Sequence, residues 1–356
     1  MKRPSRRVLI GLAAAVAAAL SIQLTVAAHA DEPPTVAVPN DNPEFLQVYD
    51  LNIENLPVVG DTCPGDWQDF VYYMRLQEYS PDLYLIQQIN GAGDARGDLD
   101  YLLARLNADF EGTYAGVLAD ADPGPGPQKC APAKGYQTNA IIYRTDRLEL
   151  VDDSVGTWQS HVDVGDGCEE NDQDRTVNVK ALFNDKVADK TVGAASLHWA
   201  TAASGGPACS AENADAAAAE LSKDAYADAE LTVTGGDFNF ADAASNGGED
   251  YHPWYKSLNG DLEGEHGYRD AVFAGCAEAG DPSACRADNW TIGGNRRIDF
   301  IFAKTRDGGM PAVTDQHTPT GDEGDEADLH FTDTDRQDVD YSDHRGVRAR
   351  VHYAST

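Results

Sequence analysis

Residues 231–239 read Leu-Thr-Val-Thr-Gly-Gly-Asp-Phe-Asn, a short β-branched run followed by two glycines and then by polar side chains. The run Leu231–Gly235 predicts a β-strand, because threonine and valine pack well on a pleated surface. The Gly-Asp-Phe-Asn that follows predicts a corner with Asp237 and Asn239 at the strand end. Such corners are common in proteins, so the rest of the chain decides what this one does.

On both sides of this corner, the chain alternates short β-like runs with stretches of helical periodicity. Further strands are expected at Phe45–Ile53, Asp82–Ile89, Thr138–Arg144, Thr176–Phe183, Val192–His198, Arg297–Ala303 and Gly346–His352. Helices are expected at Asp66–Tyr79, Leu99–Leu106 and Glu212–Ala229. Strands outnumber helices and many are joined by long loops, which favours a two-sheet α/β sandwich over a doubly wound parallel sheet.

Polar segments lie at or beside several of these strand ends. They are Leu51-Asn52-Ile53-Glu54, Ser196-Leu197-His198 and Ser342-Asp343-His344, together with Asp299 inside the apolar run Arg297–Phe302. Carboxylate and amide oxygens suit Mg²⁺, Mn²⁺ or Ca²⁺, and imidazoles suit proton transfer or phosphate binding. Each segment alone is ordinary, and a lone histidine is more often structural, but their order along the chain is specific.

Together these segments resemble the endonuclease/exonuclease/phosphatase superfamily, over residues Leu46 to Val351. Supporting segments are Ser80-Pro81-Asp82 at the start of a strand, Asn139–Arg144, and Asp174-Arg175 before a strand. The resemblance implies a DNase I-like fold, a four-layer α/β sandwich in which two central, mostly antiparallel β-sheets are flanked by helices. It also implies an active site at one edge of the sheets.

The same resemblance implies catalytic roles for five residues. His198 matches the histidine that binds or protonates the phosphoryl group, and Asp237 and Asn239 match the pair that orients the attacking water and binds the phosphate. His344 matches the catalytic histidine, and Asp299 matches the aspartate that orients it. A carboxylate beside His344 would favour its protonated form and fix its tautomer.

The implied metal site departs from the family pattern at one position. Asn52 and Asp343 match residues on the metal side of the site, but the strand that normally ends in Gln-Glu ends here in Gln87-Gln88. Gln88 therefore replaces the principal acidic ligand, and Glu54, two residues after Asn52, is the carboxylate that could compensate. We expect Mg²⁺ or Mn²⁺ at this site, with Ca²⁺ as an alternative.

The first 30 residues predict a signal peptide. The segment has a basic start and an apolar stretch, Val8–Leu20, and it ends in Ala28-His29-Ala30 before Asp31. Polar residues after Leu20 interrupt the apolar run, so cleavage and release are favoured over a membrane anchor. The Arg6-Arg7 pair leaves twin-arginine export open. We expect a secreted protein with a short lead at residues 31–44 and one domain at residues 45–356.

The charge balance bears on the substrate. The chain has 27 basic and 60 acidic residues, and removal of residues 1–30, which hold four basic and no acidic ones, changes its formal charge from −33 to −37. Such a field repels polyanions at long range, and no basic stripe for nucleic-acid phosphates is visible. This balance weakens the case for tight nonspecific DNA binding, although cations can screen the charge.

Six cysteines after the signal predict three disulfides in an exported protein. Sequence order suggests Cys63–Cys130, Cys168–Cys209 and Cys276–Cys285. Two acidic segments, Val162–Asp174 and Asp322–Asp343, are expected to be solvated loops. Asp333 and Asp335 in the second segment offer only a weak calcium-binding pattern.

These observations predict a secreted, metal-dependent phosphoesterase that hydrolyses phosphodiesters. A nuclease is favoured by the breadth of the family, so nucleic acid is among the candidate partners. A lipid phosphodiesterase of the sphingomyelinase type and a small-molecule phosphodiesterase or phosphatase stay open, although no exposed apolar hairpin for lipid is visible. The second alternative is a ligand-binding member whose catalysis is weakened by Gln88. We expect a monomer with no stable membrane anchor.

Overall fold

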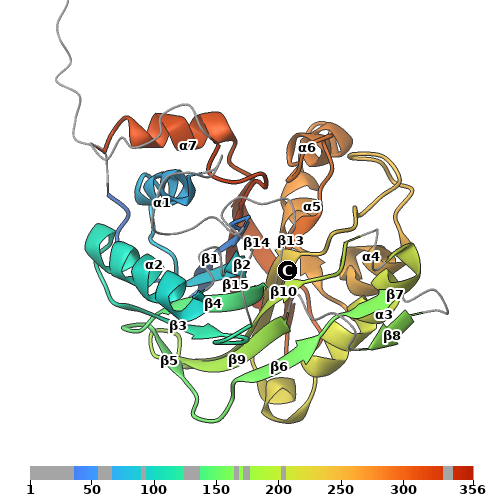
Figure 1. The fold of residues 1–356 in the computed structure, drawn as a ribbon. Coiled ribbons are helices and arrows are strands. Elements are labelled where there is room, and N and C mark those ends of the chain that lie inside the picture. Colours follow the sequence, from blue (N-terminus) through green and yellow to red (C-terminus); the bar gives the residue numbers. More distant parts are fainter. Residues whose placement is uncertain are drawn as a thin grey trace, which may run out of the picture. The chain divides into compact units, whose positions relative to one another are not determined.

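The computed structural model describes residues 36–54, 66–89, 94–123, 137–163, 168–170, 177–201, 206–331 and 340–355 (Figure 1). The predicted signal peptide, Cys63, Cys130, Asp333 and Asp335 lie outside these residues. Residues 35–356 form one compact unit. None of the described helices is both long enough and apolar enough to cross a membrane.

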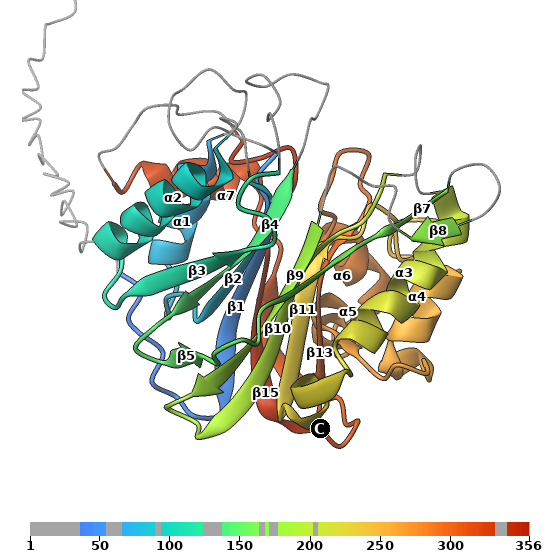
Figure 2. The same cartoon turned by 60° about the horizontal axis from the view of Figure 1, so that its bottom comes forward.

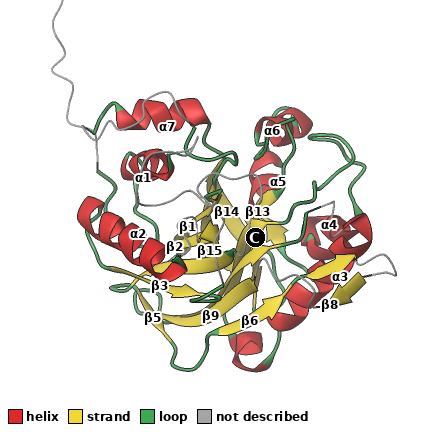
Figure 3. Ribbon diagram, viewed as in Figure 1, coloured by secondary structure: helices red, strands yellow, loops and turns green. Residues whose placement is uncertain are grey.

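The centre of this unit consists of two mixed β-sheets, drawn in yellow in Figure 3. The six-stranded sheet has the order β14 (Pro311–His317), β15 (Val347–Ser355), β1 (Phe45–Asn52), β2 (Leu83–Ile89), β4 (Thr138–Arg144) and β3 (Tyr114–Leu118). The seven-stranded sheet has the order β12 (Arg269–Asp270), β13 (Asp299–Thr305), β11 (Leu231–Asp237), β10 (Lys190–His198), β9 (Val177–Asp185) and β5 (Leu148–Leu150), and β6 (Gly156–Gln159) also pairs with β9. The pairs β1–β2 and β10–β11 are parallel, and the other pairings in these two sheets are antiparallel.

The two sheets pack face to face around an apolar core, and Figure 2 shows helices on the outer side of each sheet. In β1, Leu46 and Val48 face the other sheet, whereas Tyr49 and Leu51 face the helices, because side chains alternate along a strand. All eight residues of β1 are buried, as expected for a strand that is covered on both faces. The predicted four-layer sandwich is therefore confirmed.

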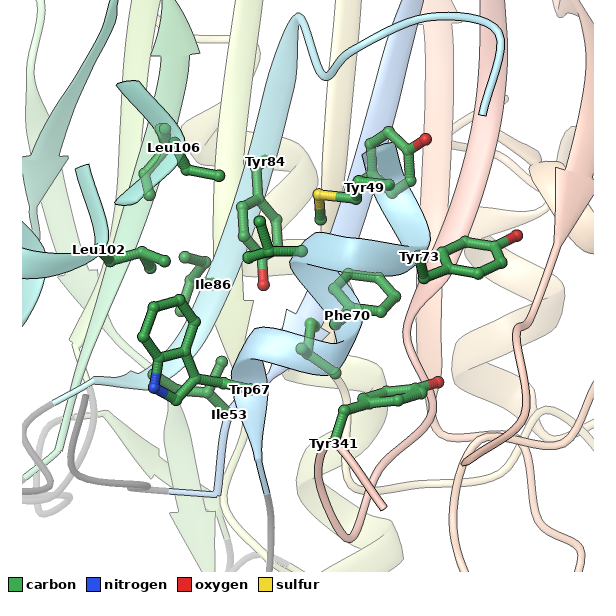
Figure 4. Packing of buried hydrophobic residues seen from close by; sticks show 14 of the residues in the cluster. Tyr49, Ile53, Trp67, Phe70, Tyr73, Tyr84, Ile86, Leu102, Leu106 and Tyr341 are labelled. Atoms are coloured by element: carbon green, nitrogen blue, oxygen red, sulfur yellow. The ribbon is translucent and has the colours of Figure 1, made fainter. Parts of the chain in front are cut away.

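The helices beside the six-stranded sheet are α1 (Trp67–Arg75), α2 (Ala95–Asp109) and α7 (Gly321–Asp328). Figure 4 shows the aromatic core beneath them, in which Phe70 of α1 lies among Tyr49, Tyr84 and Tyr341. Aromatic side chains bury a large area each, so this cluster fixes α1 firmly to the sheet.

The other helices accompany the seven-stranded sheet. They are α3 (Gly206–Glu220), α4 (Pro253–Leu258), α5 (Ala271–Cys276) and α6 (Pro282–Asp288), with short 3₁₀ turns at Asp224–Asp228 and Gly260–Leu262. Trp254 and Tyr255 of α4 pack with Phe300 and Phe302 of β13 in a third apolar cluster. A separate hairpin of β7 (His161–Asp163) and β8 (Cys168–Glu170) is linked to α3 by the disulfide Cys168–Cys209.

Most of the expected strands are present with end shifts of one to three residues, but three expectations about the other segments were wrong. The helix expected at Glu212–Ala229 starts earlier, at Gly206, and ends at Glu220, because Asp224 has a φ of 51° that no α-helix continues through. The acidic segment that was expected to be a loop from Asp322 starts instead within α7, which begins at Gly321 with a capping box between Thr320 and Glu323. The other acidic segment, Val162–Asp174, was also expected to be a loop, but it contains residues of the β7–β8 hairpin. The expected disulfides Cys168–Cys209 and Cys276–Cys285 are both present.

Candidate active site

The predicted site residues come from strand ends that meet at one edge of the two sheets. In the parallel pair β10–β11, His198 is the register partner of Asp237, and in the antiparallel pair β11–β13, Asp237 is the partner of Asp299. Three of the predicted site residues therefore lie in one row across the sheet. Gly236, just before Asp237, has a φ of 152°, and a Cβ there would lie 2.0 Å from the Leu197 carbonyl oxygen, so the corner requires glycine.

Asp237 is the centre of the site. Its Oδ2 accepts a hydrogen bond from Asn52 Nδ2 at 2.9 Å, and its Oδ1 accepts one from the Asn239 backbone N–H at 2.8 Å. The Nε2 atoms of His198 and His344 lie 3.4 Å and 3.8 Å from Asp237 Oδ2. Asn239 has a φ of 56°, which asparagine tolerates, and its side chain also donates to the Trp199 carbonyl at 2.8 Å. Asp237 is thus oriented by two asparagines and faces two imidazoles.

His344 is oriented by Asp299. Its Nδ1 lies 2.9 Å from Asp299 Oδ2 and 3.1 Å from Oδ1, and the Asp299 backbone N–H donates to Thr291 Oγ1 at 3.0 Å. Burial opposes protonation of His344, but the Asp299 and Asp237 carboxylates outweigh it and raise its pKa to about 10. Burial raises the pKa of Asp237 to about 7, and the neighbouring His344 opposes that shift. The neighbouring carboxylates therefore favour the protonated form of His344, and burial moves the pKa of Asp237 towards neutrality.

Glu54 and Asp343 lie next to this row, on the more exposed side. The Asp343 backbone N–H donates to Glu54 Oε2 at 3.1 Å, and Asp343 Oδ1 lies 3.8 Å from His344 Nε2. The Asp343 side chain is 43% exposed, whereas Glu54 is half-buried. The Glu54 backbone N–H donates to Asn52 Oδ1 at 2.9 Å, which ties this carboxylate-bearing turn to the end of β1.

Gln88 lies at a bulge in β2. The register of β2 against β4 pairs Ile86 with Ala140 and Ile89 with Thr138, so Gln87 and Gln88 together oppose Asn139. Gln88 is buried and has a φ of 61°. Because Asn52 is the register partner of Gln87, Gln88 lies at the same sheet edge as the rest of the predicted site.

Asn139, opposite the bulge, was not predicted as a site residue. Its side chain is fully buried, and neither Oδ1 nor Nδ2 has a hydrogen-bond partner among the described residues. Buried amides are rarely left without partners, so this corner is suited to a polar guest such as water or a hydrated ion.

A hydrogen-bond network beneath the site links the two sheets, and sequence reasoning missed it. Gln87 Nε2 donates to Asp50 Oδ1 at 2.9 Å and to Ser196 Oγ at 3.0 Å, and Ser196 Oγ donates to the Ile86 carbonyl at 2.8 Å. Burial, together with the nearby Asp299, raises the pKa of Asp50 well above its usual value. The position of Asp50 in line with Leu46 and Val48 was a readable signal of an acid that faces the core.

A second missed network holds the backbone of His198. Asn178 Oδ1 accepts from the His198 backbone N–H at 2.8 Å, and Ser160 Oγ donates to the His198 carbonyl at 3.0 Å. Asn178 Nδ2 also donates to Ser160 Oγ at 3.0 Å, so the two side chains form one clamp. No sequence pattern distinguished Asn178 from the other polar residues that alternate along a strand.

Comparisons with known proteins support the fold. No family model and no curated protein matches the sequence. Among solved structures, the human Nocturnin catalytic domain with bound sulfate is 14% identical, with a TM-score of 0.51 over 86% of this chain and 93% of that one. An endonuclease/exonuclease/phosphatase family protein from Leptotrichia buccalis is 13% identical, with a TM-score of 0.52 over 86% and 99%. D. rerio TDP2 complexed with a single-strand DNA product is 15% identical, with a TM-score of 0.51 over 86% and 98%.

The chain therefore has the fold of endonuclease/exonuclease/phosphatase proteins, as the sequence resemblance implied. At such low identity the likeness concerns the fold, and the chemistry has to be argued from this chain's own site.

Proposed function

We propose that the protein is a secreted, metal-dependent phosphoesterase that hydrolyses phosphodiesters. The observation that carries the proposal is the position of Asp237, whose carboxylate lies between two imidazoles and is oriented by two asparagines. Perturbed acid–base groups that share one sheet edge are typical of catalytic sites.

The geometry supports a role for each group. His344, kept protonated by Asp299, donates a hydrogen bond to a phosphoryl oxygen through Nε2, and His198 and Asn239 hold the other phosphoryl oxygens. Asp237, with a pKa near neutrality, accepts a proton from the water that attacks phosphorus. The water oxygen forms the new bond to phosphorus as the ester P–O bond breaks.

The donor set fits a hard divalent cation. Glu54 and Asp343 would supply carboxylates and Asn52 and Gln88 would supply amide oxygens, and the Asn139 amide, without a partner among the described residues, supports a polar guest at this corner. These four residues would hold Mg²⁺ or Mn²⁺, with Ca²⁺ as an alternative. The ion would neutralise charge that develops on the phosphate.

The favoured substrate class is nucleic acid or its fragments. D. rerio TDP2, which shares the fold, is described with a single-strand DNA product, and the site here carries the groups that a phosphodiester needs. The formal charge of −37 after removal of residues 1–30, with 23 basic and 60 acidic residues left, argues against tight binding of long polyanions and favours short substrates or high ionic strength. A lipid phosphodiesterase and a small-molecule phosphatase are the alternatives that use the same site.

A weakened, ligand-binding site is the second candidate, and a specific observation favours it. The buried Gln88 stands at the metal corner where the resemblance calls for a carboxylate, so the site lacks one negative charge next to a dication. The retained acid–base row argues for activity, because it is complete in residue type and in geometry.

Hydrolysis of bis-p-nitrophenyl phosphate by the exported chain tests the proposal. We expect turnover with Mg²⁺ or Mn²⁺, loss of turnover in EDTA, and none above background for the Asp237→Ala/His344→Ala double variant. Folded wild-type protein that is no more active than this variant would favour the ligand-binding alternative. Mass spectrometry of the protein from culture medium tests secretion, with Asp31 as the expected first residue.

A further inference from the structure

A pocket of about 170 Å³ opens beside His344, on the side of the site that faces α7. Its lining includes Trp290, Thr320, Asp322, Asp340, His344 and Arg345. The pocket therefore adjoins the groups proposed to bind the phosphate, because His344 belongs to both. A substrate whose phosphate lies at His344 therefore has room for a neighbouring group here.

Arg345 contributes a planar, positively charged guanidinium to the lining of the pocket. The Arg345 guanidinium carbon lies 3.2 Å from the centroid of the Trp290 ring, and the Arg345 backbone N–H donates to the Thr291 carbonyl at 2.7 Å. Among the described residues, no carboxylate forms an ion pair with this guanidinium. Both side chains are half-buried. A guanidinium stacked on one ring still offers its other face, and planar groups such as nucleobases stack well on arginine.

Acidic side chains also line the pocket. Asp322 and Asp340 are exposed residues that line the pocket near the start of α7, and Asp343 lies on the side of His344. Three carboxylates disfavour a second phosphate in this pocket, and Arg345 disfavours a simple cation. A neutral, planar ring that carries N–H donors suits both kinds of lining. It can stack on the guanidinium, and carboxylates accept hydrogen bonds from the amino groups of bases.

We infer that this pocket binds the nucleobase next to the reacting phosphate, with the ring stacked on Arg345 and its amino group directed at Asp322 or Asp340. The inference rests on the phosphoesterase function proposed above and narrows its substrate to nucleotides. It also predicts a preference for amino-bearing bases such as cytosine over uracil.

Equilibrium binding tests this without turnover. Isothermal titration of the exported chain in EDTA should give an affinity for cytidine 5′-monophosphate about tenfold tighter than for ribose 5-phosphate, as expected for one stacked base. It should also be about fivefold tighter than for uridine 5′-monophosphate. The uridine comparison uses wild-type protein, so it holds even if a variant does not fold. Equal affinities for cytidine 5′-monophosphate and ribose 5-phosphate would overturn the inference.

Variants then separate stacking from charge. Arg345→Ala should reduce the cytidine-to-ribose affinity ratio to near one, and Arg345→Lys should not restore it, because an ammonium does not stack as a plane. Arg306→Ala, which removes an exposed arginine at the opposite end of β13, should keep the ratio. Restoration of the ratio by lysine would overturn the inference in favour of a point charge that acts on the phosphate.

The nucleotide-binding test and the hydrolysis test can fail independently of each other. A base preference in a protein that hydrolyses no phosphodiester would support the base-binding pocket and contradict the proposed phosphoesterase function. Hydrolysis of bis-p-nitrophenyl phosphate with no base preference would do the reverse.

Discussion

Two clusters of buried charge lie at opposite ends of β2, and they differ in how their charges are satisfied. The first surrounds Asp82, which directly precedes the strand, and the second consists of Asp237, Asp299 and His344 beyond its other end. Both contain carboxylates that are almost fully buried. Burial alone therefore does not identify a catalytic residue.

The Asp82 cluster is neutralised by arginine. Asp82 lies 3.2 Å from Arg144 and 3.1 Å from Arg147, and Arg147 lies 2.8 Å from Asp185. Asp185 also accepts from the Tyr353 hydroxyl at 2.6 Å. Every charge here has a partner of fixed position, as expected for a cluster that holds structure in place.

The cluster at the other end consists of two aspartates, Asp237 and Asp299, and of His344. None of the described arginines lies within ion-pair distance of these two carboxylates. Burial raises the pKa of Asp237 to about 7, and Glu54 and Asp343 add further negative charge at the rim. The difference suggests that buried charge with complete pairing stabilises the fold, whereas buried charge with incomplete pairing marks the place where substrate or metal binds.

The largest effect expected from this contrast is on catalysis. Asp237→Asn should lower kcat by about 10³-fold, equivalent to about 4 kcal/mol, because the amide cannot accept the proton from water. Stability in urea should be unchanged or higher, because the change removes a buried acid that has no arginine partner. A variant that lost activity only because it unfolds in less urea would contradict the assignment of Asp237 to chemistry.

The matched change in the other cluster should act on stability instead. Arg147→Ala should lower the free energy of unfolding by about 3–5 kcal/mol, because Asp82 and Asp185 would lose their shared cation in a buried site. Urea denaturation measures this, with the exposed Arg306→Ala as the control. Residual folded Arg147→Ala protein should keep a near-normal kcat, and a loss of kcat in that fraction would mean that the two clusters are coupled.

A smaller catalytic effect is expected at Asp299, which acts through His344. Asp299→Asn should lower kcat by about 10²-fold with little change in KM, because an amide neither stabilises the imidazolium nor fixes its tautomer. Nitrogen NMR of the His344 ring should show the loss of the protonated form, a change that a purely structural role would not produce. Asp270→Asn, at a carboxylate paired with Arg297, is the control and should leave the His344 signal unchanged.

The fold, and the fact that the predicted site residues lie close together, were predictable because their signals are local. Alternating apolar residues marked the strands, and the polar residues at strand ends converged as expected from the register of Asp237 with His198 and Asp299. The start of α7 was not predicted, although Thr320 and Glu323 have the spacing of a capping box.

The supporting residues were not predictable, for a physical reason. Asn178 and Ser160 hold His198 through hydrogen bonds between segments far apart in sequence, and the bulge at Gln88 depends on its pairing with β4. Such roles depend on three-dimensional contacts for which single residue types carry no local pattern.

The smallest expected effect concerns the bulge at Gln88. It tests whether incompletely paired buried polar groups mark a binding site for a cation. Gln88→Glu adds a negative charge at the corner that also holds the unsatisfied Asn139. If incomplete pairing here reserves a place for a cation, the variant should bind Mg²⁺ about tenfold more tightly, a gain of about 1.4 kcal/mol, in isothermal titration. Gln68→Glu on α1 adds the same charge outside the strand and should leave the Mg²⁺ affinity unchanged. Weaker Mg²⁺ binding by Gln88→Glu, with the protein folded, would mean instead that the corner is built around the neutral amide.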